Sequence, residues 1–253
     1  MTLTVWEGVL VFVAGVLAGG INSVVGSGTL ITFPVLLAVG YPPVVANVSN
    51  GMGLVFGSVS GAIGYRDHLV GQRPILLRLG AIATVGGACG AVLLLVLPPG
   101  AFEAIVPALI AVALVLVVLQ PWLARKLAER QGERHPHGGI GLLVATFVVG
   151  VYGGYFGAAQ GILLMGVMGI LLSESLQRVN AIKNVLAAVV NLASGVVFVF
   201  VADVAWWAVA LIAVGSTIGG VIGAKVGKKL SPTVLRGVIV VVGTAAIVQL
   251  LLK

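Results

Sequence analysis

Lys183 is the side chain of this sequence that points most directly to chemistry. It lies within a long apolar run, and in a helix it shares one face with Asn180, Asn184 and Asn191, because residues three, four and seven positions apart line the same side. An ionisable group in a segment apolar enough to cross a membrane is expensive to keep there and usually serves a function. We therefore expect this face to bind a ligand. The alternative is a lysine whose chain reaches the nearby membrane surface.

Two glycine-rich stretches, 19–29 and 153–161, interrupt other apolar runs and carry small polar side chains. Neither stretch is expected to stay regularly helical. A helix that restarts after such a break directs unpaired N–H groups and the positive end of its dipole into the protein, which favours an anion. The alternative is that the glycines only permit a re-entrant turn. The residues expected to bind the ligand come from both breaks and from the two polar segments that face them: Asn22, Ser23, Ser27, Gly28, Thr29, Ser49, Asn50, Gly157, Gln160, Gly161, Asn180, Lys183, Asn184 and Asn191.

Acidic residues are absent from the middle of every expected span. A carboxylate proton relay or a carboxylate sodium site is therefore unsupported, although Glu174, near the end of a short apolar segment, remains as a candidate. His68, His135 and His137 lie in or beside connectors, where a solvated loop is favoured over a metal site. The sequence also contains no Ser/His/Asp arrangement, zinc signature or phosphate loop. We expect no catalytic residue, no metal site, no cofactor and hence no enzyme.

The composition is that of a membrane protein. Of the 253 residues, 60% are hydrophobic and 8% charged, whereas soluble proteins have about 45–50% apolar and 25% charged residues. The mean hydropathy is +1.21. These values exclude a disordered chain, a disulfide scaffold and a nucleic-acid binder, and make the lipid bilayer the expected partner. The net charge of +7 comes from bases spread over the connectors, which orientation by the positive-inside rule explains.

A helix needs about 20 apolar residues to cross a bilayer, because its backbone amides must all be satisfied internally. The first segment carries Glu7, lacks a basic leader and runs on into further apolar sequence, so it is expected to stay in the mature protein. The single cysteine, Cys89, is expected to be a packing residue. Two segments that follow the glycine-rich stretches are short. The expected segments are 4–21, 30–39, 44–65, 75–97, 102–123, 139–156, 162–172, 180–201, 204–226 and 233–252.

These segments form an internal repeat with an offset of about 133 residues. The matches keep their order and nearly constant spacing, which chance similarity between glycine-rich membrane helices would not produce. We expect a first transmembrane repeat (1–124), a basic cytoplasmic linker (125–138) and a second transmembrane repeat (139–253). The matching landmarks are Gly19-Gly20 with Gly153-Gly154, Gly26 with Gly157, Asn50 with Asn184, and residues 84–91 with residues 217–224.

Basic residues mark one side of the membrane as cytoplasmic. They flank the connectors near 66–78, 125–134, 178 and 225–236, which share a side only if each broken segment enters and leaves from the same face. A hairpin plus three spans gives each half an odd number of crossings, so the second half lies upside down. We expect an all-α polytopic membrane protein of two inverted repeats. Each repeat is a glycine-broken re-entrant or short-helix hairpin plus three transmembrane helices, about eight hydrophobic segments in the conventional count, a common transporter design.

Small residues recur at every fourth position on two segments, at Gly53, Gly57 and Gly61 and at Gly215, Gly219, Gly223 and Gly227. Such faces let membrane helices pack closely, since lipid provides no hydrophobic drive between helices. We expect a packing role without substrate contact. The pattern is also compatible with a homodimer interface and does not distinguish it from internal packing.

Several runs carry a family resemblance. They are AGGINSVVGSGTLITFP (18–34) and GYPPVVANVS (40–49) in the first half, and GGYFGAAQG (153–161), AIKN (181–184) with Asn191, and IGGVIGA (218–224) in the second. In this order they resemble the sulfite exporter TauE/SafE family. The resemblance implies a multi-pass transporter of a bacterial or archaeal plasma (inner) membrane that moves sulfite, sulfoacetate or related organosulfur anions. The sequence departs from the family at the second break, where Ala159 followed by Gln160 replaces the usual glycine, so that a side-chain amide takes the place of a backbone contact.

The expected function is therefore export of a small sulfur-containing anion by alternating access, with the anion bound at mid-membrane between the two broken helices. Each negative charge expelled from a negative cytoplasm gains about 2.3 kcal/mol per 100 mV, so export needs no coupled ion. Two alternatives stay open: an anion channel of the same architecture, and a transporter of a different small solute.

Overall fold

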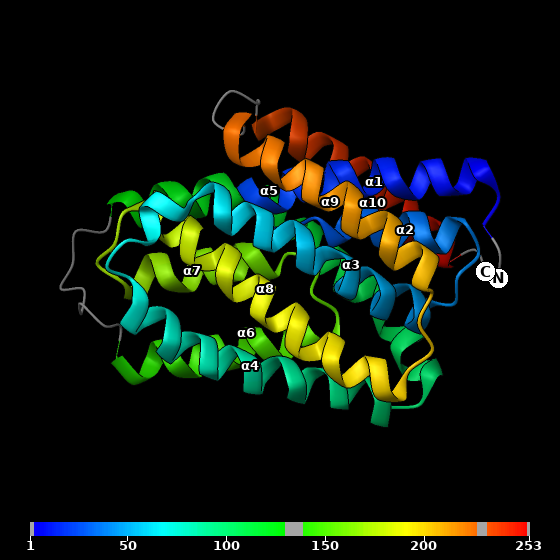
Figure 1. The fold of residues 1–253 in the computed structure, drawn as a ribbon, viewed down its shortest axis with the longest axis horizontal. Helices are drawn as coiled ribbons and strands as arrows, with labels where there is room; N and C mark the ends of the chain where they lie inside the picture. Colours follow the sequence, from blue (N-terminus) through cyan, green and yellow to red (C-terminus); the bar gives the residue numbers. More distant parts are fainter. Residues whose placement is uncertain (1–2, 130–138, 227–231, 252–253) are drawn as a thin grey trace.

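Every element in the described part of the chain is a helix (Figure 1). The computed structural model describes residues 3–129, 139–226 and 232–251. The all-α fold predicted from the sequence is confirmed. The helices are α1 (Val5–Val24), α2 (Thr29–Ala38), α3 (Pro43–Gly64), the short 3₁₀ helix η1 (Arg66–Leu69), α4 (Arg73–Val96), α5 (Pro99–Glu129), α6 (Gly139–Tyr155), α7 (Gln160–Leu171), α8 (Leu176–Val201), α9 (Trp206–Val226) and α10 (Pro232–Leu251).

Five helices of the described chain, α1, α4, α5, α8 and α9, are long and apolar enough to cross a membrane. The two helices that follow the breaks, α2 and α7, have only 10 and 12 residues. At about 1.5 Å per residue neither reaches across about 30 Å of hydrocarbon. The expectation of a polytopic membrane protein with two short helices is confirmed.

The helices lie roughly along one axis, and their connectors gather at two ends of the molecule (Figure 1). The end that we call the terminal end holds both chain termini and the connectors 39–42, 97–98 and 202–205. The opposite end, which we call the basic end, holds the connectors 65–72 and 172–175. α1 runs from the terminal end and α2 returns to it, whereas α6 runs from the basic end and α7 returns there. Each pair is a hairpin, and its re-entrant position in a bilayer stays a prediction.

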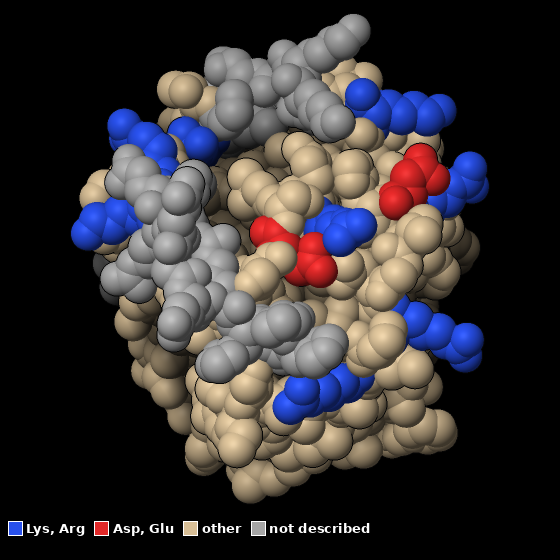
Figure 2. All heavy atoms as spheres, turned by 90° about the vertical axis from the view of Figure 1, so that its left-hand side faces the viewer, with Lys and Arg blue, Asp and Glu red and all other residues tan. Residues whose placement is uncertain are grey.

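Basic side chains gather at the basic end, which Figure 2 shows face on. The terminal end carries the acids Glu7, Glu103 and Asp203 and none of the described bases. By the positive-inside rule the basic end is the side expected in the cytoplasm. The described bases near the helix ends or in connectors are Arg66, Arg73, Arg78, Arg125, Lys126, Arg178, Lys225 and Arg236.

The breaks are shorter than the sequence suggested. α1 continues through Gly19 and Gly20 to Val24, and α6 continues through Gly153 and Gly154 to Tyr155, so only residues 25–28 and 156–159 leave the helices. Both glycine-rich stretches do leave the regular helix, as expected, but the glycine pairs at their starts stay helical. The reason is close packing: a Cβ on Gly19 would lie 2.6 Å from Ser216 Cα, and one on Gly154 would lie 2.8 Å from the carbonyl carbon of Gly87.

α5 also extends beyond its expected end. It continues to Glu129, so the first part of the expected linker 125–138 is helical. Residues 130–138, which include His135 and His137, lie outside the described residues. The proposed boundaries of the two repeats stay a prediction.

The two halves of the chain pack through each other. α1 and α3 both lie along α9, whereas α6 and α8 both lie along α4. In the same way α2 contacts α10, and α7 contacts α5. Each half therefore supplies one long helix that packs against the other half. This helix is α9 for α1 and α3, and α4 for α6 and α8. An inverted repeat would produce this exchange, and the inverted relationship itself stays a prediction.

The glycine faces lie at internal helix contacts. A Cβ on Gly53 would lie 2.6 Å from Ile212 Cβ, and one on Gly57 would lie 2.7 Å from Ser216 Cβ, so α3 approaches α9 closely at both positions. Gly227 lies outside the described residues. Cys89, in contrast, is exposed on α4, and the expectation that it packs inside the protein is wrong.

Candidate functional site

The two helix breaks meet through a pair of glycines. The N–H of Gly161, in the first turn of α7, donates to the carbonyl of Gly26 at 3.0 Å. Gly26 has a φ of +86°, which favours glycine, and a Cβ on either glycine would lie 2.5 Å from the Cα of the other. Both positions therefore require the absence of a side chain. Two segments about half the chain apart are in this way held in backbone contact at the centre of the site.

The C-terminal end of α1 is held by side chains of α8. The last carbonyls of a helix have no partner within the helix and need one from elsewhere. Lys183 Nζ donates to the Asn22 carbonyl at 2.8 Å and to the Ser23 carbonyl at 3.4 Å. The side-chain amides of Asn180 and Asn184 donate to the Ser23 carbonyl at 3.2 and 3.3 Å. The structure thus brings this predicted face together, with its donors aimed at the end of a helix.

Lys183 is completely buried, with 0% of its surface exposed. The long lysine chain therefore does not reach the membrane surface, which was the alternative to a functional role. A cation is stabilised at a helix C-terminus because that end carries about half a negative charge. The ammonium of Lys183 is held by this dipole and by the two carbonyls, and none of the ion pairs found in the described residues involves it.

The C-terminal end of α6 is held by one neutral side chain. The amide of Asn47, on α3, donates to the Tyr155 carbonyl at 2.8 Å. Asn47 stands 133 residues before Asn180, so it is the repeat counterpart of a residue that holds α1. Asn47 was not among the expected ligand residues. Its spacing from Asn180 was the signal that could have assigned it this role.

The first break is braced by its own polar residues. The Asn22 side chain donates to Ser58 Oγ at 3.1 Å and accepts from the Gly28 N–H at 3.5 Å. Asn50 donates to Thr29 Oγ1 at 3.2 Å, and Thr32 donates to Asn50 Oδ1. The polar groups of three expected ligand residues therefore make hydrogen bonds within the protein. These residues are Asn22, Thr29 and Asn50. Ser23 likewise donates its hydroxyl to the Gly20 carbonyl at 2.9 Å.

The second break depends on left-handed backbone. Gly157 and Ala159 have φ values of +76° and +58°, and the Tyr152 hydroxyl donates to the Ala158 carbonyl at 2.6 Å. Ala159 occupies the position where the family resemblance expects glycine, and its conformation is the one that glycine prefers. The Gln160 side chain lies against Gly153, where a Cβ would be 2.5 Å from Gln160 Cδ.

Two buried donors beside the glycine contact have no partner. Ser27 follows Gly26, and its Oγ is unpaired with the residue 1% exposed. Gln160 precedes Gly161, and its Nε2 is unpaired with the residue 3% exposed. Buried polar groups in native proteins nearly always have a hydrogen-bond partner, so each of these unpaired donors marks a position for a ligand or a water. These two residues are the strongest ligand candidates of the expected set.

Comparison with known proteins gives the family. The family model of the sulfite exporter TauE/SafE matches residues 11–250, nearly the whole chain. The chain belongs to the TauE/SafE sulfite exporter family. The resemblance seen in the sequence is confirmed, and the chain is a multi-pass membrane protein of a transporter family rather than of an enzyme family.

Relatives in the TauE/SafE family carry the same description. The probable membrane transporter protein YfcA of Escherichia coli (strain K12) is 30% identical over 245 residues, 96% of this chain and 89% of the relative. A probable membrane transporter protein of Haemophilus influenzae is 29% identical over 233 residues, 92% of this chain and 89% of the relative. The probable membrane transporter protein ORF9 of a Sinorhizobium species is 27% identical over 248 residues, 95% of this chain and 90% of the relative. No solved structure matches the chain.

Two of the expected ligand residues of this TauE/SafE protein lie apart from the site. Ser49 Oγ accepts from the N–H of Ala205 at 2.9 Å, at the start of α9 near the terminal end. Asn191 lies two turns beyond Asn184 along α8, where its carbonyl accepts from Ser194. The structure does not bring Ser49 or Asn191 together with the glycine contact. Ser49 matches Lys183 in repeat position, but its short side chain reaches a different partner.

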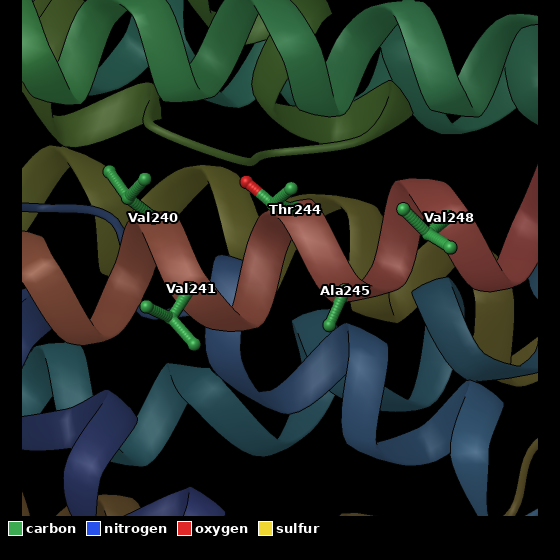
Figure 3. A pocket seen from close by; sticks show the side chains of 5 residues that line it. All are labelled: Val240, Val241, Thr244, Ala245 and Val248. Atoms are coloured by element: carbon green, nitrogen blue, oxygen red, sulfur yellow. The ribbon is translucent and has the colours of Figure 1, made fainter.

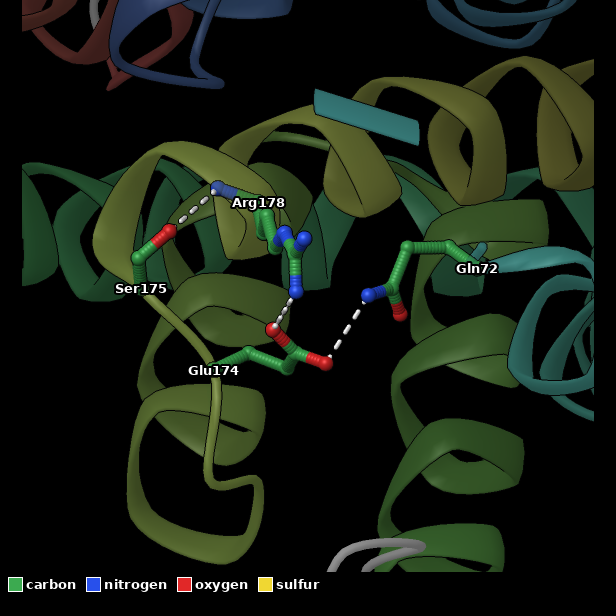
Figure 4. A network of polar contacts seen from close by, with 4 residues as sticks. All are labelled: Gln72, Glu174, Ser175 and Arg178. Atoms are coloured by element: carbon green, nitrogen blue, oxygen red, sulfur yellow. Dashed lines mark hydrogen bonds and ion pairs between the residues drawn. The ribbon is translucent and has the colours of Figure 1, made fainter. Parts of the chain in front are cut away.

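Glu174 lies in a polar network at the basic end (Figure 4). Its Oε1 accepts from Gln72 Nε2 at 2.8 Å, and its Oε2 pairs with Arg178 Nη1 at 3.1 Å. Gln72 precedes α4, whereas Glu174 lies in the connector between α7 and α8. The network therefore ties the two halves together at the basic end, away from the glycine contact.

Two of the surface hollows among the described residues lie outside the site. One, of about 440 Å³, opens at the terminal end between Tyr41, Asp203 and Trp206. Burial and, to a smaller extent, the Glu7 carboxylate raise the pKa of Tyr41 above its ordinary value. The other, of about 560 Å³, is lined by five residues of α10 alone, four of them apolar (Figure 3). Neither hollow is lined by an expected ligand residue, and Ser27, Gln160 and Lys183 are all buried.

Proposed function

We propose that this protein exports a small sulfur-containing anion, such as sulfite, sulfoacetate or a related organosulfonate, by alternating access. The observation that carries the proposal is the pair of unpaired buried donors, Ser27 Oγ and Gln160 Nε2, on either side of the Gly26–Gly161 contact. The oxygens of a sulfur oxyanion accept hydrogen bonds from a hydroxyl and an amide. The family description supports the same class of substrate.

The surroundings of these donors favour negative charge. Ser27 and Gln160 lie at the N-terminal ends of α2 and α7, where the positive ends of the helix dipoles attract anions. Lys183 adds positive charge from the end of α1, where its ammonium is held, without contacting the proposed anion. The described acids all lie toward the helix ends or in connectors, so no carboxylate opposes an anion at the centre.

The proposed cycle opens the contact between the breaks. In the present structure the Gly26–Gly161 hydrogen bond and the burial of Ser27 and Gln160 describe a closed state. Since each half holds the break of the other through Asn47 or through Lys183 and Asn180, a rocking motion of the halves would move both breaks together. Opening toward the basic end would break the Gln72–Glu174 contact. Opening toward the terminal end would strain the contact between Ser49 and Ala205.

The proposed direction is export from the basic end to the terminal end. An anion that leaves a negative cytoplasm gains about 2.3 kcal/mol per charge per 100 mV, so the membrane potential drives export. The basic end also attracts anions from the cytoplasm, which the positive-inside rule places on that side. Import would need a coupled ion.

The experiment is efflux of labelled sulfite and a panel of sulfonates from proteoliposomes under an imposed potential, with and without a proton gradient. We expect saturable efflux that follows the potential and ignores the proton gradient. Flux that does not saturate and reaches channel rates would favour an anion channel instead. No flux of any sulfur oxyanion by folded protein would direct the search to a different solute.

Side-chain variants test the site itself. Ser27→Ala and Gln160→Ala each remove one unpaired donor and are expected to weaken sulfite flux by about 10- to 150-fold, since one hydrogen bond to a charged ligand is worth about 1.5–3 kcal/mol. Thr84→Val is the matched control, because it removes an exposed hydroxyl that bonds only to the Gly80 carbonyl of its own helix. Unchanged flux in both site variants would remove these donors from the binding site.

A further inference from the structure

We propose that the C-terminal end of α1 is a binding site for a small monovalent cation, and that the Lys183 ammonium is its tethered occupant. The proposal goes beyond the transported substrate, because it concerns the charge that this helix end requires. It also stands whether or not the protein moves a sulfur-containing anion.

The ligands around the ammonium are oxygens of the kind that bind simple cations. The Asn22 carbonyl lies 2.8 Å and the Ser23 carbonyl 3.4 Å from Lys183 Nζ. Asn184, which is 1% exposed and holds the Ser23 carbonyl through its Nδ2, also has a buried Oδ1 without a partner. In transporters with broken helices, carbonyls at the C-terminal ends of half-helices coordinate sodium. Here the same kind of helix end receives an ammonium from its own chain.

No carboxylate accounts for the position of Lys183. The described acids Glu7, Asp67, Glu103, Glu129, Glu174 and Asp203 all belong to helix ends or connectors, and the ion pairs among the described residues join Arg66 to Asp67 and Arg178 to Glu174. The counter-charge of Lys183 is therefore the helix dipole together with the carbonyl oxygens. A free cation in the same place would meet the same counter-charge.

Because the ammonium is attached to the protein through the Lys183 side chain, variants of Lys183 change whether the site is occupied. In the native protein the occupant cannot leave, so the fold needs no cation from solution. Deleting the lysine chain without filling its space leaves the Asn22 carbonyl exposed to an empty pocket that a free cation can enter. Filling the same space with an apolar chain of similar length closes the pocket.

The test measures thermal unfolding midpoints of purified protein in chloride salts of equal ionic strength. Lys183→Ala opens the pocket, and Lys183→Ser opens it while reproducing the serine that stands at the matching repeat position, Ser49. Lys183→Met, which fills the space without charge, is the matched control. Choline is the reference cation because it is too large for the pocket, and ammonium, methylammonium and sodium are the probes.

We expect the midpoints of the Ala and Ser variants to be low in choline and to rise by several degrees, saturably, with ammonium or sodium, because a ligand that binds only the folded state stabilises it by mass action. The native protein and Lys183→Met should have the same midpoint in every salt. Equal midpoints in choline and in the small cations for both open variants would overturn the proposal, as would equal stabilisation of Lys183→Met. Failure of both open variants to fold in sodium or ammonium salts would also overturn it.

This outcome is separable from the proposed function. The midpoints need no substrate, so absence of sulfite flux would contradict the proposed function and leave the cation site intact. Conversely, salt-independent midpoints together with normal sulfite flux in the native protein would overturn the cation site alone.

Discussion

The two helix breaks are held by the same kind of contact but with different charge. Three donors, one of them the Lys183 ammonium, hold the end of α1, whereas the single neutral amide of Asn47 holds the end of α6. Since a neutral amide is enough to hold one break, capping alone does not explain the buried ammonium at the other. We propose that the additional charge at α1 occupies the cation position at this helix end and at the same time favours an anion at the centre.

The largest expected effect comes from separating the two breaks altogether. Gly26→Ala would place a Cβ 2.5 Å from Gly161 Cα and force alanine to a φ of +86°, and we expect a loss of about 2–5 kcal/mol in the free energy of unfolding. Gly161→Ala meets the same steric conflict without the backbone strain and should cost less. Denaturant unfolding of the purified variants measures both values.

Gly51→Ala is the control for these glycine variants. A Cβ there meets nothing within 4 Å, and the residue lies in α3. It should leave stability unchanged or raise it by up to about 1 kcal/mol, because alanine favours a helix over glycine. If Gly26→Ala behaves like Gly51→Ala, the backbone contact does not hold the breaks together.

The second prediction compares the two caps directly. Asn47→Ala leaves the Tyr155 carbonyl without its donor and should cost about 1–3 kcal/mol. Asn180→Ala should cost less than about 1 kcal/mol, because the Ser23 carbonyl keeps Asn184 and Lys183 as donors. The measurement is the difference between the two unfolding free energies. Equal costs would show that Asn184 and Lys183 do not compensate for the loss of Asn180 at the Ser23 carbonyl.

The third prediction concerns the backbone of the breaks. Gly28 stands two residues after Gly26, and Ala159 stands two residues after Gly157. Both preceding glycines have positive φ, yet Gly28 has a φ of −59° and Ala159 a φ of +58°. Ala159→Gly should stabilise the protein by about 0.5–1 kcal/mol by relieving left-handed strain. Gly28→Ala should destabilise it, because the new Cβ would lie 2.6 Å from the Ala18 carbonyl oxygen. Opposite signs in a thermal melt would support the difference between the breaks.

The smallest expected effect is at the basic end. Glu174→Gln keeps an oxygen that accepts from Gln72 but loses the ion pair with Arg178, whose side chain is 45% exposed. Partly exposed ion pairs contribute about 0–1 kcal/mol, so we expect little change in stability. Sulfite flux that collapses in this variant would assign Glu174 a role in the transport cycle beyond joining the two halves.

The sequence predicted the elements of this fold better than their contacts. Hydropathy and the spacing of the bases predicted the helices and the two hairpins, because both depend on the local chain. The helical continuation through Gly19 and Gly154 was missed, because those glycines serve contacts with α9 and α4, far away in the chain. A glycine that breaks a helix and a glycine that permits close packing look the same in one sequence.

The candidate site was predicted in part for a similar reason. The polar face of α8 follows from helical spacing, and Lys183, Asn180 and Asn184 do act together. Their partners are backbone carbonyls, which have no signature in a sequence. The repeat offset matched Ser49 to Lys183, but side-chain length decides what each one reaches, and Ser49 reaches Ala205.

The packing of each half against the other also limits when native contacts can form during synthesis. α1 and α3 are synthesised first, yet the helix along which both lie, α9, ends at Val226. During synthesis α1 and α3 therefore remain in the membrane without this partner until nearly the whole chain has been inserted. Contacts between such distant segments form slowly and leave early segments open to wrong partners. A chain that stops before α9 lacks the helix against which α1 makes most of its native contacts.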